Sequence, residues 1–383
     1  MSGPDRVIVL GGGIGGLVAA SELRKRLPEQ HEVVIVDREP DHLFSPSLLW
    51  LMTGQRRPKQ IVRPLRRLER KGIRVVCGDI TDIDPGNKSV DVAGDTIEAD
   101  HIVVSLGAEL APERIPGLEA AGHNLYSLAG VEGLRRALGE FDGGRIVVLT
   151  AAPAYKCPAA PYEAAMLLEH HLRKAGDHIE MAMYAAEPGP LGVAGPEVSA
   201  GVRQMVEEKG IAYHPEHQVA EVDAATRRIA FTNSTHADFD LLVYVPPHTA
   251  PGVVRAAGMT DESGWIPVDR NTMETRFDGI YAIGDVTNIP LAMGKPLPMA
   301  GVFAHLQAEV VARNLVNTMT GQGTTTEYDG FGECFVETGS GKAGFGKGNF
   351  YAEPFPAVRL RNEARRWHAA KVLFEKRWLT KWF

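Results

Sequence analysis

Two cysteines are the residues of this chain whose type and position could carry redox chemistry. Cys157 lies in the run YKCPAAPYE, and Cys334 follows 177 residues later in the run FGEC. If the fold brings them together, they can form a disulfide that accepts and returns two electrons. Lys156 and the N-terminus of a following helix would favour the reactive thiolate form of Cys157, so we expect its pKa to be low.

The N-terminus predicts a strand, a glycine-rich turn and a helix in succession. An apolar run at residues 6–10 leads into the letters GGGIGG, and a helical pattern covers residues 17–27. Gly11, Gly13 and Gly16 stand at the spacing G-x-G-x-x-G. In this context the spacing is a strong sign of a dinucleotide site.

Each residue of this turn has a physical role in binding a dinucleotide. Gly11 permits the tight turn, Gly13 lets a pyrophosphate approach the backbone, and Gly16 lets the helix pack closely on the strand. The helix N-terminus offers free N–H groups and a partial positive charge to the phosphates. A second strand, residues 33–36, ends at Asp37, where an acid can bind a ribose hydroxyl.

Two later segments favour FAD over NAD as the dinucleotide. The run 275–285 (TRFDGIYAIGD) resembles the second FAD signature of flavoproteins with two dinucleotide-binding domains, where an aspartate binds the ribityl chain. Asp285 stands at that aspartate position, and the run 102–107 (IVVSLG) resembles the intermediate motif of the same proteins. The predicted cofactor-binding residues are Gly11, Gly13, Gly16, Asp37, Ile80, Gly107, Gly284, Asp285 and Gly301.

A second strand–turn–helix unit is predicted in the middle of the chain, but its turn differs. A strand at 146–150 leads through the turn 151–158 into a helix at about 162–174, and further strands are expected at 179–184 and 241–245. The turn contains no glycine, so a pyrophosphate could not approach its backbone. We therefore expect this unit to keep the α/β fold without binding NADH, and to place Cys157 at the ligand-binding end of its sheet.

Composition limits the class of protein. The chain has 383 residues, is 44% apolar and 23% charged, and has a net charge of −7, which does not suggest nucleic acid. Three cysteines are too few for a disulfide scaffold, and Cys77, inside the apolar run 74–77, is expected in the core. The sequence shows no apolar targeting segment and no apolar run long enough to span a bilayer. We therefore expect the protein to act on the cytoplasmic side.

These observations predict the α/β class, with two Rossmann-like domains of the FAD/NAD(P)-linked disulfide reductase type and a C-terminal amphipathic helical segment. The expected parts are an FAD domain in two segments, 1–113 and 266–325; a second Rossmann-like domain with Cys157 at 114–265; and a C-terminal region with Cys334 at 326–383.

The whole chain resembles the sulfide:quinone oxidoreductases and the related flavin subunits of flavocytochrome c sulfide dehydrogenase. The resemblance rests on the runs 157–163 (CPAAPYE) and 298–304 (PMAGVFA) and on the segment of Cys334. It implies that Cys157 and Cys334 form a redox disulfide, that sulfide attacks it, and that electrons pass to FAD and then to a membrane quinone. Glu163 matches an acidic residue that could carry protons, although an acid in the first helical turn is also favoured by the helix dipole.

The chain departs from that family in three places. Residues 108–145 lack the third cysteine of many members, so the sulfur product and its chain length stay open. Met299 stands where a lysine is common, and Lys295 is a residue that could compensate for the missing lysine. The family's histidines have no clear match; His42 and His305 are site candidates for which surface or packing roles are the simpler expectation. No metal site is predicted.

The C-terminus predicts a basic amphipathic helix. Residues 359–383 hold eight Lys/Arg and two Asp/Glu, and Ala370, Phe374, Trp378 and Trp382 recur every four residues. Such a helix suits the surface of an anionic bilayer, where it would make the protein a peripheral (monotopic) membrane protein. A helix docked on the protein itself or in a homo-oligomer is the competing expectation.

Three other functions fit parts of the pattern. A type II NADH:quinone dehydrogenase would share FAD, the quinone and the helix, but needs NADH to bind without the second glycine motif. A flavocytochrome-type subunit would pass electrons to a haem partner. A non-enzymatic flavin redox sensor would show flavin reduction with negligible turnover.

Overall fold

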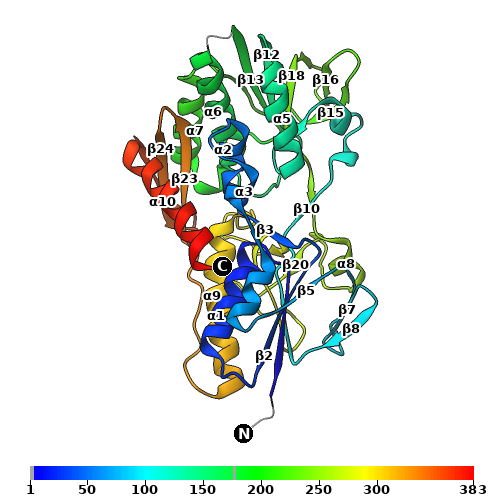
Figure 1. The fold of residues 1–383 in the computed structure, drawn as a ribbon. Coiled ribbons are helices and arrows are strands. Elements are labelled where there is room, and N and C mark those ends of the chain that lie inside the picture. The colour runs from blue at the N-terminus through cyan, green and yellow to red at the C-terminus, as the bar shows by residue number, and fades with distance from the viewer. Residues whose placement is uncertain (1–3, 176–177) are drawn as a thin grey trace.

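The computed structural model describes residues 4–175 and 178–383 and contains two large parallel β-sheets (Figure 1). The first sheet has the order β21-β9-β1-β2-β5. Its strands are β21 (Ile280–Ala282), β9 (His101–Val104), β1 (Arg6–Leu10), β2 (Glu32–Asp37) and β5 (Arg74–Cys77). Helices or further strands cover both faces, which explains why β1, β2 and β9 are almost continuously apolar.

The second sheet has the order β11-β18-β12-β13-β14 and is also parallel throughout. Its strands are β11 (His123–Asn124), β18 (Leu241–Val245), β12 (Gly144–Thr150), β13 (Ile179–Ala185) and β14 (Ala212–His214). The predicted α/β class with two Rossmann-like units is therefore confirmed.

Helices position the turns that end the central strands of both sheets. The helix α1 (Ile14–Arg26) follows the first turn and lies beside α9 (Gly301–Thr320), with Gly301 close against Ile14 (Figure 1). The helix α6 (Ala160–Ala175) follows the second turn. The remaining α-helices apart from the C-terminal one are α2 (Leu48–Met52), α3 (Pro58–Ile61), α4 (Leu118–Ala121), α5 (Leu128–Glu140), α7 (Pro196–Glu207) and α8 (Gly252–Ala256).

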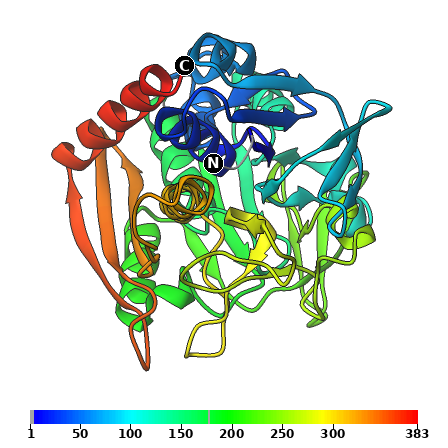
Figure 2. The ribbon, with the colours of Figure 1, turned by 90° about the horizontal axis from the view of Figure 1, so that it is seen from below.

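An antiparallel sheet and the last helix form one side of the molecule (Figure 2). The sheet consists of β23 (Phe331–Gly339), β24 (Lys342–Asn349) and β25 (Ala357–Ala364), and α10 (Arg365–Lys381) packs along it. Because β23 also packs against α6, Cys334 comes to lie near the start of α6, where Cys157 precedes the helix.

Small sheets extend the two large units, and most of them are antiparallel. They consist of β6 (Ile80–Asp84), β7 (Ser89–Val92) and β8 (Asp95–Glu98); β15 (Val219–Asp223), β16 (Arg228–Phe231) and β17 (His236–Asp238); and the pairs β3 (Asp41–Leu43) with β4 (Val62–Pro64), β10 (Glu109–Leu110) with β19 (His248–Thr249), and β20 (Ile266–Pro267) with β22 (Thr287–Asn288), the last of which is parallel. Among the helices of the described residues, none has the length and apolarity needed to cross a bilayer.

The helix α10 docks on the protein through part of its predicted apolar face. Trp378, Leu379 and Trp382 are 3%, 6% and 3% exposed, so the expectation that this face looks outward is wrong for these three side chains. They belong to the core that α1 and α9 share. Leu373 and Phe374 remain exposed on the outer side of the helix.

Candidate active site

The first glycine turn has the geometry that its sequence predicts. Gly11 has a φ of +99°, which favours glycine, and a Cβ on Gly16 would lie 1.8 Å from the Gly11 carbonyl oxygen. A Cβ on Gly13 would meet no atom within 4 Å. The turn is therefore closed on the helix side and open at Gly13, as a bound pyrophosphate requires.

Asp37 ends β2 beside this turn. Its Oδ2 accepts a hydrogen bond of 2.5 Å from the Gly12 N–H, and its Oδ1 accepts one of 2.8 Å from the Glu39 N–H. The carboxylate is thus fixed at the carboxyl end of the parallel strands, which is where open α/β sheets bind their ligands.

Asp285 has a buried oxygen without a partner. Its Oδ1 has no hydrogen bond among the described residues, and burial raises the pKa of the carboxyl while the Lys156 ammonium offsets part of the rise. A buried polar atom without a partner usually belongs to a ligand site. A polyol chain such as the ribityl group of FAD would supply the missing hydrogen bond, so the residues present fit this cofactor.

The other predicted cofactor residues lie around this region. Gly284 precedes Asp285 with a φ of +73° and donates its N–H to Gln307 at 2.8 Å. Gly107 follows β9 with a φ of +69° and open space around it, and Gly301 begins α9. Ile80 is half-buried at the start of β6 and packs on the core beneath the first sheet.

The second turn is filled by side chains instead of being open. Tyr155 and Tyr162 are 6% and 0% exposed, and their hydroxyls donate to Glu187 Oε1 at 2.5 and 2.8 Å. The hydroxyl of Thr150 donates to Glu187 Oε2 at 2.9 Å. Glu187 comes two residues after β13, whereas Asp37 is the last residue of β2. The acid that could have bound a second ribose is therefore hydrogen-bonded within the protein itself.

Cys157 is tied to the N-terminal end of α9. Its N–H donates to the Met299 carbonyl at 2.6 Å, and its own carbonyl accepts a hydrogen bond of 3.1 Å from the Tyr126 hydroxyl. Its φ is +49°, an uncommon conformation for a residue with a side chain. These contacts hold the cysteine next to the run that contains Met299 and Gly301.

Cys157 and Cys334 are both free thiols, and they lie close enough to influence each other. Burial, and then the charges of Cys334 and Glu163, raise the pKa of Cys157 well above its usual range. Cys334 is open to solvent on one side, yet the surrounding protein desolvates it and raises its pKa to about 12. The expected low pKa of Cys157 is therefore wrong: desolvation outweighs every nearby cation.

Lys156 lies close enough to Asp285 for their charges to influence each other. Burial lowers its pKa, and the Asp285 carboxylate is the largest influence in the opposite direction. The same cation, together with burial, lowers the pKa of His248 to about 4. The third cysteine, Cys77, is exposed on the edge strand β5, so its predicted place in the core is wrong.

Glu163 forms a buried ion pair that the sequence did not predict. Its Oε1 accepts from Lys371 Nζ at 2.6 Å and from the Glu337 N–H at 2.8 Å, and it is 2% exposed. Glu337 in turn bonds His368 Nδ1 at 2.9 Å. Lys371 and Glu375 lie on the same face of α10 as Trp378, which faces the protein. Two charged residues four positions apart on this face are the sequence signal that the helix docks on the protein.

His42 and His305 have packing roles. The Nε2 of His42 accepts a hydrogen bond of 3.2 Å from Trp378 Nε1, and its Nδ1 bonds the Gly12 carbonyl at 2.8 Å. The ring of His305 contacts Trp378 in a tilted arrangement and Trp382 edge-on, with ring centroids 5.5 and 5.8 Å apart. Both histidines thus anchor α10 to the FAD unit.

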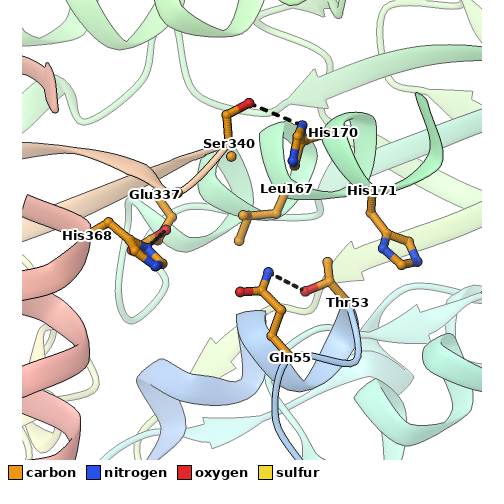
Figure 3. Close-up of a pocket in the computed structure, with 10 residues that line it drawn as sticks. Thr53, Gln55, Leu167, His170, His171, Glu337, Ser340 and His368 are labelled. Carbon is orange, nitrogen blue, oxygen red and sulfur yellow. Dashed lines mark hydrogen bonds and ion pairs between the residues drawn. The ribbon is translucent and has the colours of Figure 1, made fainter. Parts of the chain in front are cut away.

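A cavity of about 470 Å³ opens beside the Glu337–His368 pair (Figure 3). Its lining residues are Thr53, Gln55, Leu167, His170, His171, Glu337, Gly339, Ser340, Gly341 and His368. In the part of the chain that the structure describes, no group of three or more His, Cys, Asp or Glu side chains is arranged to hold a metal ion.

Comparisons with known proteins agree with this geometry. The family model described as pyridine nucleotide-disulphide oxidoreductase matches residues 5–308. The chain is 28% identical to the sulfide-quinone reductase of Aquifex aeolicus, over 98% of this chain and 90% of the relative. It is 25% identical to the mitochondrial sulfide:quinone oxidoreductase of Mus musculus, over 91% and 79%.

A solved structure and a more distant relative complete the comparison. The sulfide:quinone oxidoreductase structure from Aquifex aeolicus matches with a TM-score of 0.88 at 24% identity, covering 99% of this chain and 91% of that one, which shows the shared fold. A type II NADH:quinone oxidoreductase of Staphylococcus haemolyticus is 22% identical over 84% of each chain.

Proposed function

Because this chain belongs to the pyridine nucleotide-disulphide oxidoreductase family, we propose that it oxidises sulfide with FAD and passes the electrons to a quinone. The curated relatives named for this reaction match most of the chain. The observation that carries the proposal is the second turn. Where a nicotinamide nucleotide would need glycines and a free acid, the chain has Cys157 near Cys334, and Glu187 is bonded to two tyrosines.

FAD would be held by the residues of the first unit. Gly13 leaves room for the pyrophosphate, Asp37 is positioned for a ribose, and the unpartnered oxygen of Asp285 suits the ribityl chain. When bound, FAD accepts two electrons from the sulfur site and gives them to the quinone. Everything else that the reaction needs must come from the chain's own side chains.

The two cysteines would act as a redox disulfide. Hydrosulfide attacks one sulfur, a new S–S bond forms on that cysteine, the Cys157–Cys334 bond breaks, and the electron pair leaves on the other cysteine as a thiolate. Burial raises the pKa of both thiols, so a thiolate there is costly to maintain. That cost favours passing the electrons onward rather than leaving the pair reduced.

The quinone would reach the protein from a bilayer surface. The outer side of α10 exposes Leu373 and Phe374 next to the basic residues Lys376, Arg377 and Lys381. Each basic residue near an anionic bilayer contributes about 1 kcal/mol to binding. The apolar pair and the cations together support peripheral attachment by α10, which also suits a lipid-soluble electron acceptor.

The attachment can be tested with the double variant Leu373→Ser/Phe374→Ser. We expect its binding to anionic vesicles to fall by about tenfold, because both side chains are exposed and apolar. Its thermal stability and its activity with a water-soluble quinone analogue should match the wild type. Unchanged vesicle binding would contradict attachment through this side of α10.

The cysteine proposal can be tested by sulfide-dependent reduction of a soluble quinone analogue. We expect Cys157→Ser and Cys334→Ser each to lower the rate on the order of 10³-fold or more, since each removes the disulfide. Both should retain FAD, because neither residue lies in the first unit. The matched control is Cys77→Ser, an exposed cysteine, which should keep wild-type activity. Full activity in both site variants would overturn the proposal.

A further inference from the structure

Four residues lie in succession between the cysteines and the cavity: two side-chain pairs, Glu163 with Lys371 and Glu337 with His368, are joined by a backbone hydrogen bond and by the charge of Lys371, which acts on Glu337. Lys371 Nζ donates to Glu163 Oε1 at 2.6 Å, and the Glu337 N–H donates to the same oxygen at 2.8 Å. His368 Nδ1 lies 2.9 and 3.1 Å from the two oxygens of Glu337. We call Glu163, Lys371, Glu337 and His368 the acid–base chain.

The acid–base chain joins two different environments. At one end, the charge of Glu163 acts on the thiols of both Cys157 and Cys334. At the other end, Glu337 and His368 line the cavity of about 470 Å³, across from Gln55 (Figure 3). That volume has room for several water molecules. The acid–base chain therefore lies between the two cysteines and the polar cavity.

The charges of the acid–base chain leave room for one proton. Glu163 and Glu337 are 2% and 1% exposed and share one ammonium, that of Lys371. Burial works against the Lys371 charge, but Glu163 and Glu337 outweigh it and raise the Lys371 pKa. Two buried carboxylates and one ammonium carry a net charge of −1, which a single added proton would neutralise. Histidine is the side chain best suited to exchange that proton near neutral pH.

The surroundings of the acid–base chain keep it in place. The ring of Trp50 contacts His368 edge-on at 5.9 Å, and Lys371 Nζ lies 5.4 Å from the same ring. His170, on α6, bonds the Ser340 hydroxyl at 3.4 Å on the far side of the cavity. Among the described residues, the titratable groups that face the acid–base chain include Cys157, Cys334 from β23, and His170 and His171 from α6.

We propose that the acid–base chain carries the proton that sulfide loses at the cysteine pair to the cavity. This inference rests on the proposed function. H₂S gives one proton to Glu163 and attacks the disulfide as hydrosulfide; a bond forms between its sulfur and one cysteine, the Cys157–Cys334 bond breaks, and the other cysteine leaves as a thiolate. One sulfide proton stays on the persulfide, and the other passes through Glu163 and Lys371 to Glu337 and His368. His368 then delivers it to the cavity.

The test is the rate of flavin reduction by sulfide in the FAD-loaded protein without quinone. We expect His368→Ala to slow this step by roughly 100-fold, as removal of a general base does. Added imidazole should restore the rate in the variant, because the cavity beside position 368 has room for it. The solvent deuterium isotope effect should also rise in the variant, since proton transfer becomes limiting.

Two further variants separate proton transfer from a structural role. Glu337→Gln keeps the shape of the side chain and the packing on Trp50, and should slow the step without rescue by imidazole. The matched control is Glu363→Gln, which removes a carboxylate of the same sheet whose ion pair with Lys342 lies at the surface. It should leave the rate unchanged.

The outcomes distinguish this proposal from the proposed function. Wild-type reduction by sulfide together with wild-type rates in His368→Ala and Glu337→Gln would overturn the proton route and leave the function standing. A slow His368→Ala variant that imidazole does not rescue and whose isotope effect is unchanged would show a structural role, and would also overturn it. A wild-type flavin that sulfide does not reduce would overturn both.

Discussion

The two strand–turn–helix units of this molecule have the same topology, but the turn of the first is open and the turn of the second is filled by side chains. In the first, Gly16 lets α1 approach the strand and Gly13 leaves the turn open. In the second, the side chains of Tyr155 and Tyr162 fill the space and bond Glu187. We interpret the first turn as a phosphate site and the second as a support for the Cys157 thiol.

The acids at the ends of the neighbouring strands show the same difference. Asp37 accepts two hydrogen bonds from backbone N–H groups, which fix its carboxylate beside the glycine turn. Glu187 accepts three from side-chain hydroxyls and is thereby bonded within the protein. The comparison teaches that an α/β unit can keep its sheet while its ligand-binding end takes up different chemistry, because only the turn and one acid have to change.

The largest effect on this comparison is expected at Gly16. A Cβ there would lie 1.8 Å from the Gly11 carbonyl oxygen, so Gly16→Ala should lower the free energy of unfolding by about 1–3 kcal/mol and reduce the FAD content sharply. The matched variant is Gly13→Ala, whose Cβ meets no protein atom.

Gly13→Ala should change stability by less than about 0.5 kcal/mol and still weaken FAD binding. Chemical denaturation of the FAD-free proteins and titration with FAD measure the two quantities separately. Equal stability of both alanine variants, or unimpaired FAD binding by Gly13→Ala, would break the interpretation of the first turn as a phosphate site.

A smaller effect is expected at Asp285. Its raised pKa means that the folded FAD-free protein binds a proton at this carboxyl more tightly than the unfolded chain does. The stability from that proton is present below the ordinary pKa of 3.8 and is lost as the pH rises through the raised folded value. Asp285→Asn should therefore stabilise the FAD-free protein by about 1 kcal/mol at neutral pH.

The gain from Asp285→Asn should shrink as the pH falls toward 4, while FAD affinity decreases in the variant. Thermal unfolding of the FAD-free protein, followed from about pH 4 to about pH 8, measures the first effect, because carboxyl groups lose their protons within this range. A variant that is less stable than the wild type at neutral pH would show that Asp285 is satisfied without a ligand.

The sequence predicted the parts of the site that depend on local spacing. The glycine turn, Asp37, Asp285 and the glycine-free turn before Cys157 could be located because a strand, a turn and a helix specify one another over a short stretch. The central strands of the two units and the helices that follow their turns were predicted within a few residues of their observed bounds for the same reason.

The parts that depend on tertiary packing could not be predicted. Lys371 lies more than 200 positions from Glu163 in the chain, and only the docking of α10 brings them together. The direction of the Cys157 pKa was predicted wrongly because its local sequence shows a lysine and a helix start but not the depth of burial. Trp378 was assigned outward because an amphipathic pattern does not say which surface covers it.

The central claim is that the second turn serves sulfur chemistry and not a nicotinamide nucleotide. Anaerobic titration of the FAD-loaded protein with sulfide, and separately with NADH, while the flavin absorbance is followed, tests it most directly. The account predicts that sulfide bleaches the flavin, that added quinone restores the absorbance, and that NADH has no effect. Bleaching by NADH with no response to sulfide would contradict it and would identify a quinone-reducing NADH dehydrogenase.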